Sequence, residues 1–363
     1  MTEVLVRASA LRQLVRESNV RLLRPSVAES VIACSEELSL AGEASVALEL
    51  LSSIAERLDE SDFDTATRFS LAKARALHKN GQYRESLELL RNVLNADAAR
   101  LRALEGEVYS LRILEASNLW RLDRVEEAVE RLRAIRRELL ARPDSSHLAV
   151  CAWQLQAVSI LRGDHEQARR FGLEAIVSAR RTGSMHIEAC AHDNMARLER
   201  YQCRWPAAVE SGELAVAGLR ALGCRCEANN SLRSLAITLW KRGRCDEAML
   251  KARECLEEAR GIGHATLERY AGLLVGMIHV SRGEWRLVEP YLGDSVHLQC
   301  MVSDARAELL RIELMGDSYL EQGKAERALE YFDQVWPQAL ALVPKGDIVA
   351  ELRRRRAECY YLL

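Results

Sequence analysis

The sequence predicts an all-α protein, folded as a solenoid of short helical repeats. A turn, usually centred on glycine, recurs about every forty residues, and apolar residues flank each turn at helical spacing. Self-similarity at a fixed period of this size is typical of solenoids, in which each repeat buries its core against its neighbours. The eight turn residues are Gly42, Gly81, Asp123, Gly163, Cys203, Gly243, Gly283 and Gly323.

Each turn separates two segments that read as helices. From Asp123 onward the turns are 40 residues apart, and the two earlier spacings are 39 and 42. In the sixth repeat, Leu232, Leu235 and Leu239 precede the turn at Gly243 with spacings of three and four. Glycine adopts positive φ without steric cost, so it ends the first helix of each hairpin readily.

Small residues recur at two positions of the repeat, where we expect helices to approach closely. Five residues after the turn, the small residues are Ala47, Ser86, Ala128, Ala168, Ala208, Ala248 and Ala328, with Val288 as the exception. Seven residues before the turn, they are Ala74, Ala116, Ala196, Ala236, Gly276 and Gly316. A large side chain at either position would push neighbouring helices apart.

Composition narrows the class of protein further. The chain has 363 residues, of which 48% are hydrophobic and 29% charged, and no apolar run approaches the length of a membrane span. Charged residues near the start argue against a signal peptide, so the ten cysteines read as reduced thiols of a cytoplasmic protein. A net charge of −2 argues against direct nucleic-acid binding by this region.

The pattern resembles the tetratricopeptide repeat, over about residues 26–363. The resemblance rests on the turn, on the small residue five positions later, and on an aromatic residue two positions later, present as Tyr83, Trp205 and Trp285. The closing proline of that family is absent and the period is longer. Long periods of this kind are similar to those in the arms of bacterial transcription regulators.

This resemblance implies a right-handed superhelix of about eight repeats. We expect a capping helix in residues 1–25, the solenoid in residues 26–345, and a last helix in residues 346–363. The last helix reads as the first helix of a ninth repeat or as a cap. We therefore expect the chain to be the N-terminal part of a longer polypeptide.

No motif in the sequence predicts a catalytic, metal or cofactor site. His186, Cys190, His192 and Cys203 are candidate zinc ligands, but packing of Cys190 in a helix core is the favoured interpretation. Cys224 and Cys226 form a pair in a loop with no second pair at metal-site spacing; their redox activity is left open. The run Arg353–Arg356 is interpreted as a solvated helix face rather than a nucleic-acid contact.

The first helices line the concave face in tetratricopeptide arrays, so the resemblance implies a ligand groove there. Positions three, six, nine, ten and thirteen residues before each turn are expected to point inward. Asparagine binds a peptide backbone through a donor and an acceptor, arginine binds carboxylates, and aromatic residues anchor apolar side chains. The predicted groove residues are Trp153, Asn194, Arg197, Arg200, Asn230, Arg233, Trp240, Tyr270 and Met277.

The leading functional hypothesis is a scaffold that binds a protein or peptide and is not itself an enzyme. It would act as the sensor or regulatory arm of a larger bacterial signalling or transcription regulator. Two alternatives remain open: a stand-alone adaptor for complex assembly, and the regulatory half of a repeat-fused protease. We expect no membrane partner, and homodimerisation is left open.

Overall fold

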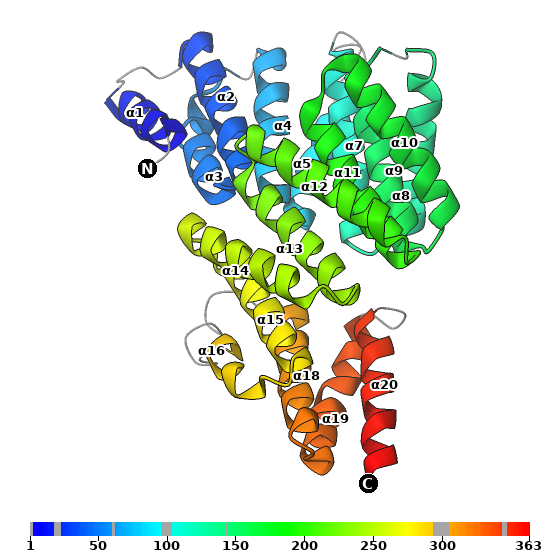
Figure 1. The fold of residues 1–363 in the computed structure, drawn as a ribbon. Helices are drawn as coiled ribbons and strands as arrows, with labels where there is room; N and C mark the ends of the chain where they lie inside the picture. Colours follow the sequence, from blue (N-terminus) through cyan, green and yellow to red (C-terminus); the bar gives the residue numbers. More distant parts are fainter. Residues whose placement is uncertain are drawn as a thin grey trace. The chain divides into compact units, whose positions relative to one another are not determined.

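The computed structural model describes residues 3–17, 23–59, 62–95, 104–142, 144–292, 305–342 and 347–363, and its regular structure there is helical throughout. None of the helices in these ranges combines the length and apolar character needed to cross a membrane. The helices before the fifth turn are α1 (Glu3–Glu17), α2 (Pro25–Ala41), α3 (Ala44–Ser52), α4 (Phe63–Lys79), α5 (Tyr83–Leu94), α7 (Glu105–Arg121), α8 (Val125–Leu139), α9 (Ser146–Leu161), α10 (His165–Thr182) and α11 (Met185–Tyr201). Those after it are α12 (Trp205–Ala221), α13 (Arg225–Lys241), α14 (Cys245–Ile262), α15 (Ala265–Ser281), α16 (Glu289–Leu292), α18 (Ala305–Glu321), α19 (Ala325–Leu342) and α20 (Asp347–Leu362). Figure 1 shows them as successive helical hairpins.

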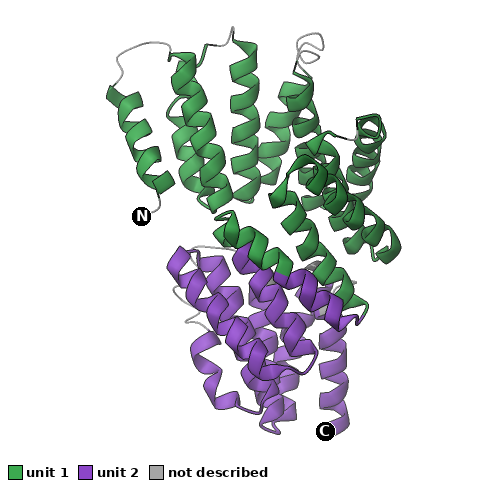
Figure 2. Ribbon diagram, turned by 45° about the horizontal axis from the view of Figure 1, so that its top comes forward, with its two compact units in different colours: residues 1–202, 214–227 green, residues 203–213, 228–363 purple. Residues whose placement is uncertain are grey.

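The chain forms two compact units (Figure 2). Unit 1 comprises residues 1–202 and 214–227, and unit 2 comprises residues 203–213 and 228–363. The expected division into a cap, a solenoid and a terminal helix stays a prediction; α1 lies in the first of these segments and α20 in the last.

The backbone at the turns confirms the repeat. All eight turn residues have positive φ, including the two that are not glycine, Asp123 at 64° and Cys203 at 56°. Three further glycines with positive φ, Gly183, Gly223 and Gly263, end second helices at the same 40-residue interval. Left-handed residues therefore end helices both within and between repeats in this part of the chain.

The small residues lie where helices approach most closely. Every small residue five positions after a turn is fully buried, from Ala47 to Ala328. At the position seven residues before the turn, a β-carbon on Gly276 would lie 2.7 Å from Cδ2 of Leu314, and one on Gly316 would overlap the ring of Phe332. The crowding expected from sequence is therefore present at both positions.

The seventh repeat departs from the pattern after its turn. A short 3₁₀ turn, Trp285–Leu287, and the four-residue α16 take the place of a long second helix in the described residues. This is the repeat in which Val288 stands at the small position and Pro290 follows. Proline inside a helix removes a backbone donor and clashes with the preceding turn, which accounts for the interruption.

The first helices of successive repeats form one layer in unit 1. Contacts join α2 to α4, α4 to α7, α7 to α9 and α9 to α11. We call α2, α4, α7, α9 and α11 the first-helix layer of unit 1. The side chains that this layer presents where neighbouring repeats meet are the candidates for a functional site.

The two turn residues that are not glycine give a stability prediction. Replacing Cys203 with glycine should raise the free energy of unfolding by about 1 kcal/mol, because a β-carbon in the left-handed region costs about 1–2 kcal/mol. Denaturant unfolding of Cys203→Gly against wild type measures the effect. Gly163→Ala, at an equivalent turn with φ of 72°, should change stability in the opposite direction. A loss of stability in Cys203→Gly would contradict the interpretation.

Candidate functional site

The nine residues predicted for the groove divide between the two units. Unit 1 contains Trp153 on α9 and Asn194, Arg197 and Arg200 on α11. Trp153 packs partly buried against a cluster that includes Met195 and Leu198. Asn194 is only 5% exposed and its Nδ2 atom is buried without a hydrogen-bond partner. The residues at the same position in repeats four, six and seven, Gln154, Ser234 and Leu274, are buried as well, so this position takes part in the packing between helices.

Three arginines lie near the C-terminal ends of α7 and α11 in the first-helix layer. Arg121, at the end of α7, and Arg197 and Arg200 on α11 form what we call the arginine cluster. Desolvation lowers the pKa of Arg121, and the charge of Arg197 lowers it further. Desolvation also lowers the pKa of Arg200, again with a contribution from Arg197, whereas Asp193 opposes the shift. Arg197 itself donates a hydrogen bond of 3.1 Å to Asp193.

Aromatic rings flank the arginine cluster. The guanidinium of Arg121 lies 4.0 Å from the ring centre of Trp120 and 6.0 Å from that of Tyr83. Trp120 donates through Nε1 to Gln154 on α9 at 3.2 Å. Because α9 contacts both α7 and α11, its Trp153 belongs to the same layer as the three arginines. Cationic groups beside aromatic faces suit a ligand that carries both an anionic and an apolar group.

The five predicted residues of unit 2 differ in how they contact neighbouring side chains. Arg233 on α13 lies over the ring of Tyr270 on α15, at 5.1 Å. Trp240 donates through Nε1 to the hydroxyl of Ser281 at 2.9 Å. Met277 and Tyr270 pack partly buried against a cluster with Leu273 and Val280. Asn230 is exposed.

Arg121 and Trp120 are missing from the residues predicted by sequence. A signal for Trp120 was present, because it stands three residues before the turn at Asp123, a position used for the prediction in the fourth to seventh repeats. Arg121 lies one residue further on, outside the positions considered. The charge of Arg197 on the fifth repeat acts on Arg121 of the third, and sequence spacing alone does not reveal such an influence.

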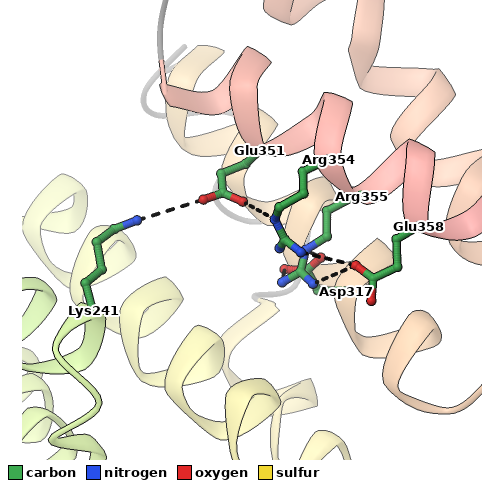
Figure 3. A network of polar contacts seen from close by, with 6 residues as sticks. All are labelled: Lys241, Asp317, Glu351, Arg354, Arg355 and Glu358. Carbon is green, nitrogen blue, oxygen red and sulfur yellow. Dashed lines mark hydrogen bonds and ion pairs between the residues drawn. The ribbon is translucent and has the colours of Figure 1, made fainter.

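The arginine run near the end of the chain is bound within unit 2 (Figure 3). Arg354 pairs with Glu351 at 3.0 Å and with Glu358 at 3.2 Å. Arg355 pairs with Asp317 on α18 at 2.7 Å. The remaining two arginines, Arg353 and Arg356, lie over the ring of Trp336 at 5.7 and 4.7 Å, and Arg356 also pairs with Asp333. These contacts engage the run in the packing of α20 within unit 2, so the face is less solvated than expected.

The cysteine and histidine candidates separate into two groups. His186 and Cys190 lie together near the start of α11. Among the described residues, the potential ligand atoms that lie within 4.8 Å of one another belong to His186, Cys224 and Glu227, and this group does not include Cys190, His192 or Cys203. Cys224 is buried and Cys226 half-buried, and desolvation raises the pKa of both thiols. A raised thiol pKa disfavours the thiolate, which is the reactive form of cysteine.

Comparison with known proteins finds solved structures of similar fold. No family model matches the sequence, and no curated protein matches it. The solved structures that are similar include a Rap protein in complex with competence and sporulation factor, with a TM-score of 0.60 at 12% identity, covering 93% of this chain and 98% of that one. The apo quorum sensor NprR from B. thuringiensis aligns with a TM-score of 0.61 at 11% identity over 90% of both chains. Aspartyl phosphate phosphatase F from Bacillus subtilis aligns with a TM-score of 0.58 at 14% identity, over 95% of this chain and 94% of its own.

These similarities extend over nearly the whole of each chain. Together with the eight left-handed turns, they show that the chain has the fold of the tetratricopeptide-type helical repeat proteins. The prediction of an all-α solenoid of this type is confirmed. Identities of this size establish the fold, and the function rests on the site.

The network in Figure 3 gives a pH prediction. Burial raises the pKa of Asp317 to about 6 from 3.8, and the charges of Arg355 and Arg354 only partly oppose this. Since the folded state then holds the proton more tightly, the stability from the neutral carboxyl is present below pH 4 and is lost as pH rises through about 6. Asp317→Asn removes this dependence. The stability of wild type relative to Asp317→Asn should fall by up to about 3 kcal/mol over that interval.

Urea unfolding of both proteins from pH 4 to pH 7 measures this difference. Asp333→Asn is the matched control, because Asp333 also pairs with an arginine of α20 but is half-exposed. A constant difference between wild type and Asp317→Asn across the pH range would show that Asp317 is charged throughout.

Proposed function

We propose that this chain binds a peptide, or an extended segment of a protein, through the arginine cluster of the first-helix layer of unit 1. The observation that carries the proposal is the position of Arg121 over the ring of Trp120, where desolvation and, to a smaller extent, the charge of Arg197 on the fifth repeat lower the pKa of Arg121. Like charges held together on a folded surface repel one another. An anion that binds between them relieves the repulsion and gains charge-assisted hydrogen bonds.

A peptide carboxylate suits this surface better than a free inorganic anion. Arg121 lies over Trp120, and Trp153 stands on the helix between α7 and α11. Aromatic residues beside the cations would hold apolar side chains next to an acidic group or a C-terminus. The unit 2 residues Arg233, Trp240 and Tyr270 are proposed as ligand contacts within unit 2.

We further propose that ligand binding makes the chain the sensor or regulatory arm of a larger bacterial signalling or transcription regulator in the cytoplasm. In support, structures of similar fold include one named as a quorum sensor and one in complex with a named factor. Small rotations at successive repeat interfaces add up along a solenoid, so a ligand that favours one superhelical pitch shifts the population toward it. The adaptor and the protease-linked alternatives remain open. The expectation that the chain is not an enzyme stays a prediction, because one similar structure is named as a phosphatase.

The test is peptide selection followed by affinity measurement. A library of short peptides with free C-terminal carboxylates is selected on the purified chain, and the enriched sequence is titrated by calorimetry. Arg121→Gln with Arg197→Gln should weaken its binding at least about tenfold, because hydrogen bonds to charged groups contribute about 1.5–3 kcal/mol each. Higher salt should weaken wild-type binding further.

The matched control is Arg170→Gln, which removes one exposed arginine from α10, a second helix of the same unit. It should leave the affinity unchanged. Equal affinities of wild type and the double variant, with equal helical circular dichroism, would rule out the arginine cluster as the binding site.

A further inference from the structure

A second polar cluster lies in unit 1, apart from the arginine cluster, where three separate segments of the chain meet. The last residue of α4, Lys79, reaches Glu227 near the start of α13. The first turns of α11 bring His186 and Cys190 to the same place. The loop before α13 adds Cys224. We call His186, Cys190, Cys224 and Glu227 the four-residue cluster.

The donor atoms of this cluster converge. One nitrogen, oxygen or sulfur atom each from His186, Cys224 and Glu227 lie within 4.8 Å of one another. Nε2 of His186 is 2.6 Å from Oε2 of Glu227 and 3.7 Å from Sγ of Cys190. Zinc–sulfur bonds of about 2.3 Å and zinc–nitrogen bonds of about 2.0 Å place neighbouring ligands of a tetrahedral site roughly 3.3–3.8 Å apart. The atoms of His186, Cys224 and Glu227 are therefore within about 1 Å of that arrangement, whereas Cys190 lies outside this group of three and is placed beside it by its 3.7 Å approach to His186.

The residue types and their spacing point the same way. His186 and Cys190 are one helical turn apart on α11, so their side chains lie on one face. Cys224 and Glu227 are three residues apart in the turn that opens α13. Structural zinc sites commonly combine two such local pairs, with ligands separated by two to four residues in each. We propose that the four-residue cluster binds a thiophilic divalent cation of the Zn²⁺ class, with His186, Cys190, Cys224 and Glu227 as its four ligands.

Lys79 completes the charge balance of such a site. A divalent cation with two thiolates, one carboxylate and a neutral imidazole has a net charge of −1. The ammonium of Lys79 donates to Oε1 of Glu227, whereas Oε2 is the oxygen that faces His186. One carboxylate oxygen thus serves the lysine and leaves the other for the cation. Outer partners of this kind orient a ligating carboxylate and neutralise excess charge.

The polar contacts of the sulfur atoms of Cys190 and Cys224 are long. Cys224 is 3% exposed, and its thiol lies 3.9 Å from the carbonyl oxygen of Leu222. Cys190 is 8% exposed and its contact is the 3.7 Å approach to His186. Packing alone does not require two thiols beside an imidazole and a carboxylate. A cation would engage all four groups and would tie α11 to the start of α13, next to the end of α4.

This inference goes beyond the proposed function, and its test involves no peptide. The purified chain is stripped with a chelator, re-loaded with an equimolar amount of Zn²⁺, passed through gel filtration and assayed by atomic emission. We expect one zinc per chain. Loading with Co²⁺ instead should give intense tetrahedral d–d bands together with a thiolate-to-cobalt charge-transfer band. Retention of no metal, or a weak octahedral cobalt spectrum without the thiolate band, would overturn the proposal.

Variants locate the site. Cys190→Ser with Cys224→Ser should remove the thiolate band and weaken zinc binding by more than the tenfold or so expected from an outer partner. Cys226→Ser is the matched control, because Cys226 lies two residues along the same turn with its sulfur against Gly42. It should bind zinc as wild type does. Unchanged zinc affinity in the double variant would exclude the two cysteines.

Folding is checked in each variant by circular dichroism. If the double serine variant loses helicity, Glu227→Gln provides a second route, because it keeps the shape of the side chain and an oxygen for Lys79. We expect that variant to retain cobalt less than wild type does. Full retention would contradict the role of Glu227, and the cobalt spectrum of wild type stays decisive in either case.

Discussion

Close approach of the two helices in each hairpin is the constraint on which the rest of the structure depends. It requires a residue in the left-handed region to end the first helix, followed five positions later by a residue too small to separate the pair. The eight turns satisfy the first requirement, and the fully buried residues from Ala47 to Ala328 satisfy the second. In the seventh repeat Val288 stands at the small position and Pro290 follows it, and the second helix is interrupted there. Repetition of one local solution builds the layer of first helices that carries the candidate site.

That layer also explains the electrostatics of the site. Packing brings long side chains from non-adjacent repeats together, so Arg121 of the third repeat meets Arg197 of the fifth. Many of the other arginines in the described residues are satisfied by carboxylates or aromatic rings, as in the run on α20. The arginine cluster differs because desolvation, with a smaller contribution from the charge of Arg197, lowers the pKa of both Arg121 and Arg200. A ligand anion is the natural counterpart of such an arrangement, whereas the paired arginines of α20 serve packing.

The two candidate sites also differ in how much of each could be predicted. The register of the repeat identified Arg197, Arg200 and Trp153, because positions relative to a turn repeat along a solenoid. It misjudged the position nine residues before the turn, where Asn194 is packed rather than open. It missed Arg121, which lies outside the chosen positions. For the four-residue cluster, the sequence singled out His186, Cys190 and Cys224 as candidates, but it did not point to Glu227 and did not show that these residues meet. Their pairing with Lys79, 148 residues before Glu227, depends on how unit 1 curves.

The sequence by itself determined the helical repeat, its forty-residue period, its turns and its tightly packed positions. These follow from local chemistry, since a left-handed turn and a small residue act within one hairpin. Only the tertiary structure decided which side chains from different repeats become neighbours. That outcome depends on the small rotation from each repeat to the next, which accumulates along the chain and is not encoded in the residues of a single repeat.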